Sequence, residues 1–95
     1  MTREIEAQDV RQEARLLFAL LDAIDSECLI SDSGVQSRWR ALKARVNGGS
    51  SYEAEAEDSY ELLVKIARTA RIRGTWMETR WLATEGRIRS GVSVS

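Results

Sequence analysis

Histidine is absent from this 95-residue chain, and cysteine occurs once, as Cys28. Without an imidazole there can be no Ser-His or Cys-His nucleophile pair, no HExxH motif and no Glu-x-x-His di-metal site. A single thiol can form neither an intrachain disulfide nor a zinc site by itself. We therefore expect a protein that is not an enzyme and that holds neither a cofactor nor a metal.

Proline is also absent, and only six glycines occur. A β-protein of this length typically has turn clusters every 8–12 residues or so, whereas the one strong break here is residues 47–51, Asn-Gly-Gly-Ser-Ser. Glu, Arg, Ala and Leu are abundant, and all four favour helix. The sequence therefore predicts one all-α domain over residues 1–90, followed by a frayed tail at 91–95.

Long apolar runs are missing too. The longest spans residues 16–21, which is six residues, whereas a membrane-spanning helix needs about 20. Glu4, Glu6 and Asp9 lie where a signal peptide would be cationic and then apolar. We expect no membrane association and a cytoplasmic location.

Apolar residues repeat at steps of four and three in four segments, 2–28, 34–46, 51–73 and 75–89. This spacing places them on one face of a helix that packs nearly parallel or antiparallel to a neighbour. The four apolar ladders are Val10, Ala14, Leu17, Leu21, Ile24 and Cys28; Val35, Trp39, Leu42 and Val46; Tyr52, Ala56, Tyr60, Leu63, Ala67 and Ala70; and Met77, Trp81, Thr84 and Ile88. Because free cysteine is often buried, we expect Cys28 to lie in the core.

The ends of these helices carry recognisable signals. Ser31 and Ser33 are candidate N-caps of the second helix. Gly74 suits the position just after a helix. Capping-box spacing occurs twice, in Ser50 with Glu53 and in Thr75 with Glu78. Since short connections make sequential helices antiparallel neighbours, we expect a small four-helix assembly with two long helices, 2–28 and 51–73, and two shorter ones.

The first candidate binding surface is on the last helix. At about 100° per residue, Trp76 points away from Met77 and Trp81, and Arg80 and Arg87 share its side of the helix. Trp and Arg are the residue types that most often dominate interface energies. We expect Trp76 to anchor a protein partner while Arg73, Arg80 and Arg87 engage its acidic groups. The alternative is that Trp76 packs into the corner between the third and fourth helices.

A second surface lies on the first helix, where Leu16, Leu20 and Ala23 fall to one side of the ladder. These residues are either covered by the fourth helix or form a seam with another chain, including a second copy of this one.

The charges are unevenly distributed although the formal net charge is only −1. Residues 1–28 carry three basic and seven acidic side chains, and residues 65–95 carry seven basic and two acidic ones. Arg38, Arg40, Lys43 and Arg45 surround Trp39. Basic groups beside a tryptophan could bind a nucleic-acid backbone and stack bases, or the basic segments could pair with the acidic ones within the fold or across a dimer.

The leading hypothesis is therefore a non-catalytic protein-binding module, an adaptor or inhibitor of a larger protein or complex, acting as a homodimer. In type only, the chain resembles the compact proteins with which phages and plasmids block host machinery, which implies an inhibitor and assigns no residue a role. The alternatives are a nucleic-acid-binding protein that uses its arginine-rich helices and a structural subunit of an oligomer.

Overall fold

A computed structural model describes residues 7–69 and 71–90 of the chain. The helices are α1 (Ala7–Gln12), α2 (Ala14–Ser26), α3 (Ser33–Asn47), α4 (Ala56–Ala67) and α5 (Trp76–Ser90), and no strand occurs among the described residues. Apart from α1, which has six residues, these are the four expected helices, so the all-α class is confirmed. The predicted frayed tail, residues 91–95, lies outside the described residues.

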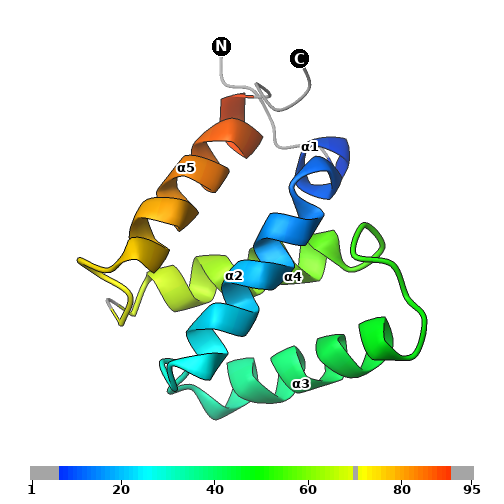
Figure 1. The fold of residues 1–95 in the computed structure, drawn as a ribbon, viewed down its shortest axis with the longest axis horizontal. Helices are drawn as coiled ribbons and strands as arrows, with labels where there is room; N and C mark the ends of the chain where they lie inside the picture. The colour runs from blue at the N-terminus through cyan, green and yellow to red at the C-terminus, as the bar shows by residue number, and fades with distance from the viewer. Residues whose placement is uncertain (1–6, 70, 91–95) are drawn as a thin grey trace.

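Helix α4 lies at the centre of the molecule, where it packs against α1, α2 and α3 (Figure 1). It crosses behind α2 and runs back above α3 in the opposite direction (Figure 1). Helix α5 packs along α1 and α2 and runs antiparallel to α2 (Figure 1). This arrangement brings α2 and α5, which are far apart in the sequence, side by side at the surface.

The core is made from the predicted apolar ladders. Trp39 and Trp81 are buried, at 0% and 3% exposure, and the α2 ladder from Ala14 to Ile24 is buried throughout. The outer members Val46, Tyr60 and Ala67 are only partly buried, because they lie at the rim of this core. None of the helices in the described part of the chain combines the length and the apolar character that a membrane crossing requires.

The expected first helix is divided at Glu13, between α1 and α2. The Glu13 N–H donates to the carbonyl of Val10 at 3.1 Å, a three-residue step that is tighter than an α-helical turn. The Glu13 side chain turns inward and accepts two hydrogen bonds from Arg87, at 2.8 and 3.0 Å. The periodicity predicted a helical segment here but not its division, and residues 2–6 of the expected helix lie outside the described residues.

The third helix is shorter than its predicted span of 51–73. Ser50 does not cap it, because its hydroxyl donates to the Glu55 carboxylate at 2.8 Å. Residues 52–55 form a turn, and within it the Tyr52 ring packs against Phe18 at 5.0 Å between centroids. At the other end, the Thr69 hydroxyl donates to the carbonyl of Ile66 at 2.6 Å, in the turn that follows α4.

The N-cap of α3 is Asp32 and neither of the two predicted serines. Its carboxylate accepts the backbone N–H groups of Gly34 at 2.8 Å and Val35 at 3.0 Å. A carboxylate here satisfies two of the amide groups that a helix start leaves without intrahelical partners, and it is favoured by the helix dipole.

Cys28 is exposed, so the expectation of a buried thiol is wrong. Helix α2 ends at Ser26, and Cys28 has φ +58°. The N–H of Cys28 donates to Asp25 and the N–H of Leu29 to Ile24. This pair of hydrogen bonds is a Schellman motif, which reverses the chain and turns the residue in the left-handed conformation away from the helix face.

Candidate functional site

Trp76 is 56% exposed, whereas Trp39 and Trp81 are buried. It is the first residue of α5. The turn before it has Gly74 at φ +80°, and the Glu78 carboxylate accepts the Gly74 N–H at 3.0 Å. The indole therefore does not fill the corner between α4 and α5, and more than half of its surface is open to contact.

Leu16 faces this tryptophan from α2. Leu16 is 38% exposed, while Leu20 beside it is 3% exposed. Two adjoining hollows between the helices share Leu16, Trp76 and Arg80 in their linings. We name them together the α2–α5 groove, which is lined by Leu16, Ala19, Leu20, Trp76, Thr79, Arg80, Ala83 and Arg87.

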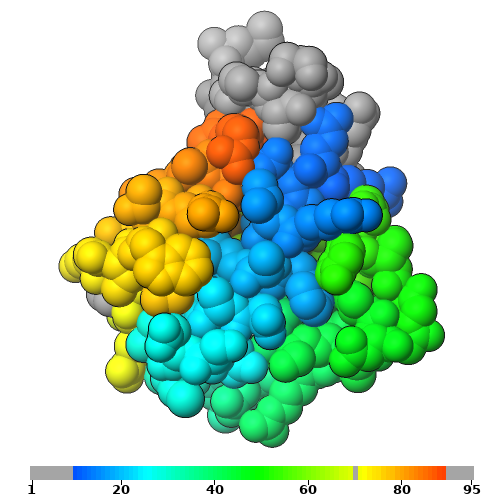
Figure 2. Space-filling model, in the orientation of Figure 1, coloured from blue at the N-terminus to red at the C-terminus, as the bar shows by residue number. Residues whose placement is uncertain are grey.

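The α2–α5 groove lies on the face shown in Figure 2, where the gold and orange surface of α5 meets the blue surface of α2. Leu16 and Leu20 of one predicted surface therefore line the same groove as Trp76, Arg80 and Arg87 of the other. The centre of the groove is apolar, and its α5 side carries the arginines Arg80 and Arg87.

The predicted basic residues of this surface have different surroundings. The Arg80 guanidinium lies 6.0 Å from the centre of the Trp76 ring, within the range of a cation–π contact. Arg87 lines the groove but also holds Glu13, whose side chain is only 7% exposed. Arg73 is exposed in the turn before α5 and does not line the groove, and Ala23, which is half-buried, does not line it either.

The candidate sites predicted from the sequence did not include Arg11 and Arg15, which lie exposed next to this surface, or Leu82, which is exposed elsewhere on α5. Arg11 and Arg15 line a neighbouring hollow that shares Leu16 with the groove and also includes Glu53, and Arg15 lies over the Tyr52 ring at 5.9 Å. Leu82 is 57% exposed on α5, outside the groove. Because Leu82 is not part of the predicted apolar ladder, its exposure could have been predicted from the sequence. No sequence pattern around Arg11 and Arg15 indicated that they lie next to the groove.

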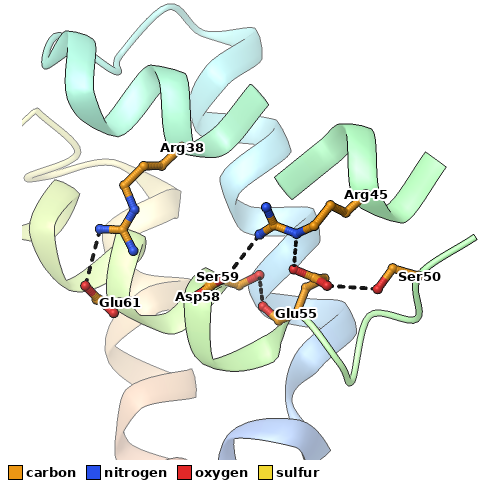
Figure 3. A network of polar contacts seen from close by, with 7 residues as sticks. All are labelled: Arg38, Arg45, Ser50, Glu55, Asp58, Ser59 and Glu61. Atoms are coloured by element: carbon orange, nitrogen blue, oxygen red, sulfur yellow. Dashed lines mark hydrogen bonds and ion pairs between the residues drawn. The ribbon is translucent and has the colours of Figure 1, made fainter. Parts of the chain in front are cut away.

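The basic residues around Trp39 are largely paired with acidic residues within the fold. Arg38 contacts Glu61 at 3.3 Å, and Arg45 contacts Glu55 at 2.7 Å (Figure 3). Lys43 lies 3.8 Å from Asp25, whose carboxylate also accepts the indole N–H of Trp39 at 3.1 Å. This tryptophan is fully buried, so its ring is not available to stack on a base.

The network in Figure 3 also changes the acidity of one carboxyl group. Hydrogen bonds from Arg45 and then Ser50 hold the pKa of Glu55 below its ordinary value, because both donors stabilise the charged form. Arg45 reaches Asp58 as well, at 3.0 Å. The network ties the end of α3 to the start of α4, and its role is structural.

Within the described residues, no three His, Cys, Asp or Glu side chains are grouped so that they could hold a metal ion. Comparison of the chain with protein-family models, with curated proteins and with solved structures finds no match.

Proposed function

We propose that this protein is a non-catalytic binding module, an adaptor or inhibitor, whose α2–α5 groove holds an acidic segment of a larger protein. The observation that carries the proposal is the 56% exposure of Trp76 beside Leu16. Large apolar side chains exposed next to one another mark interaction surfaces. Tryptophan and arginine are also among the residue types enriched in interface hot spots.

The charges around the groove favour an acidic partner segment with an apolar anchor. Arg80 lies beside Trp76 on the α5 side, and Arg11 and Arg15 line the neighbouring hollow, which shares Leu16 with the groove and also includes Glu53. The lining of the groove contains no acidic residue. An apolar side chain of the partner would pack between Leu16 and Trp76, and flanking carboxylates would meet the arginines. Arg87 has the different task of holding Glu13 in place.

The test compares a groove variant with a control variant that carries similar substitutions elsewhere on the surface. Trp76→Ala with Arg80→Glu alters the groove, whereas Leu82→Ala with Arg40→Glu alters exposed residues of similar type outside it. Each variant is used to capture proteins from the native host, and the affinity of every purified partner is then measured. We expect the groove variant to bind at least ~30-fold more weakly, the loss typical of a hot spot, and the control to bind normally. Partners that bind both variants equally would show that the groove is not the site.

The other hypotheses predict different measurements. Nucleic-acid binding through the arginine-rich helices predicts a gel shift at low salt that is lost steeply as salt rises. We expect no shift, because Trp39 is buried and its neighbouring cations are largely paired. Self-association as a homodimer or larger oligomer predicts a multiple of the 10.7 kDa chain mass in sedimentation. The homodimer and the cytoplasmic location stay predictions.

A further inference from the structure

Another hollow lies away from the groove, between the connection that joins α2 to α3, the first half of α3 and the end of α4. Its volume is about 390 Å³. It is lined by Leu29, Ile30, Ser31, Asp32, Gly34, Val35, Arg38, Lys65, Ile66, Arg68 and Thr69. In Figure 1 these segments are the cyan connection between α2 and α3, the first half of α3 and the yellow-green end of α4. The hollow shares no lining residue with the α2–α5 groove.

The floor of this hollow is apolar. Ile66, Val35 and Ile30 are buried in the core but still line the hollow, and Leu29 is half-buried beside them. Hollows of roughly 300–1,000 Å³ with an apolar lining and a few polar groups are typical sites for small ligands. The size and floor therefore suit the apolar part of a small organic molecule.

The rim has a surplus of positive charge. Arg38 and Lys65 both approach the same oxygen of Glu61, at 3.3 and 3.8 Å, so one carboxylate serves two cations. Arg68 is exposed, and in the described part of the chain no acidic group lies within ion-pair distance of it.

The one carboxylate in the lining is already bound. The Asp32 carboxylate accepts hydrogen bonds from the N–H groups of Gly34 and Val35. Its negative charge therefore lies at the start of α3. The side chains of Arg38, Lys65 and Arg68 thus lie around an apolar floor together with the carboxylates of Asp32 and Glu61. Both carboxylates already have hydrogen-bond or ion-pair partners. A negatively charged head group would complement this rim.

We propose that this hollow binds a small amphiphilic carboxylate, with its apolar body on Ile30, Val35 and Ile66 and its head group held by Arg68 and Lys65. The arginine offers two parallel N–H donors to a carboxylate, and the lysine adds a point charge. The site is independent of the proposed protein-binding groove, so either proposal can fail alone.

The test titrates the whole protein with octanoate and follows backbone amide shifts by NMR. Two matched probes separate the contributions: 1-octanol has the apolar body without the charge, and acetate has the charge without the apolar body. We expect saturable one-to-one binding of octanoate, with shifts at Gly34, Val35 and Ile66, and at least ~10-fold weaker binding of each control probe.

Three variants then assign the site. Arg68→Gln is expected to weaken octanoate binding ~10-fold, as the loss of a charge-assisted hydrogen bond does. Ser31→Trp places a bulky side chain at an exposed lining position and is expected to abolish binding. Arg71→Gln, which alters an exposed arginine outside the hollow, is expected to bind normally.

Octanoate that gives no saturable shifts, octanol that binds as tightly as octanoate, or an equal loss in Arg68→Gln and Arg71→Gln would each overturn the proposal. Thermal melting of every variant separates lost binding from lost folding. The Trp76→Ala variant is expected to bind octanoate as the unmodified protein does, which distinguishes this site from the α2–α5 groove.

Discussion

Cys28 occupies a backbone position that is normally taken by glycine. Its φ of +58° lies in the left-handed region, where a side chain with a Cβ costs about 1–2 kcal/mol. The two hydrogen bonds of the Schellman motif, together with the half-buried Leu29 that follows, hold the residue there. The local strain is the cost of reversing the chain between α2 and α3.

Replacing this cysteine with glycine is expected to stabilise the protein. Cys28→Gly removes the Cβ clash, and part of the gain is offset by the greater freedom of glycine in the unfolded chain. We expect a net increase of about 0.5–1 kcal/mol in the free energy of unfolding, measured by urea denaturation. Cys28→Ala keeps the Cβ and should match the unmodified protein. A glycine variant that is less stable than the alanine variant would contradict the left-handed conformation.

At the scale of the helices, one ion pair connects α5 to the junction between α1 and α2. Arg87 of α5 donates two hydrogen bonds to Glu13, which lies at the junction of α1 and α2. The Glu13 side chain is 7% exposed, so its charge is largely removed from water. A buried carboxylate needs such a partner, because leaving it unpaired costs several kcal/mol.

Removal of this partner is expected to be strongly destabilising. Arg87→Met keeps much of the aliphatic chain but leaves the Glu13 carboxylate without its two hydrogen bonds. We expect a loss of about 2–4 kcal/mol in the free energy of unfolding, again by urea denaturation. The control is Arg89→Met, because Arg89 is 63% exposed in its contact with Glu85 and such surface pairs contribute about 0–1 kcal/mol. Equal losses in both variants would show that Glu13 is not buried as described.

At the scale of the whole molecule, oppositely charged segments pair across the fold. Arg38 and Arg45 of α3 contact acidic residues of α4, and Lys43 contacts Asp25 of α2. One of the two sequence-based explanations for the basic segments, internal pairing, therefore accounts for most of the cations around Trp39. This pairing also makes the fold sensitive to acid.

Acidification is expected to weaken the contact between α3 and α4 through Glu55. Its pKa in the fold is below the ordinary value of 4.5, chiefly because Arg45 and then Ser50 donate hydrogen bonds to the charged form. The carboxylate therefore contributes its full stabilisation above the unfolded-state pKa and loses it as the pH falls through the lower, folded-state pKa.

Glu55→Gln is expected to be less stable than the unmodified protein at neutral pH, and the difference should shrink as the pH falls through the lowered, folded-state pKa of Glu55. Urea denaturation at several pH values measures this convergence. Glu57→Gln, an exposed position on the same helix, serves as the control and should show little difference at any pH. Parallel stability curves for Glu55→Gln and the unmodified protein would contradict the assigned contacts.

Most of the local structure could be predicted from the residues. The ladders in α2, α3 and α5 identified their buried faces correctly, because a 3.6-residue period is a property of each segment alone. Helix ends were less predictable. Asp32 displaced the two serines as the N-cap of α3, and Ser50 was engaged by Glu55, so the competition between nearby polar groups decided both boundaries.

The sequence by itself determined an all-helical chain without imidazole chemistry and with Trp76 and Leu16 outside the main ladders. Only the tertiary structure decided that these two residues meet in one groove, that Glu13 pairs with Arg87 across 74 positions, and that Cys28 is exposed. The reason is physical. Helix periodicity depends on neighbours within a turn or two, whereas the relative placement of α2 and α5 depends on how all the buried faces pack against α4 at once.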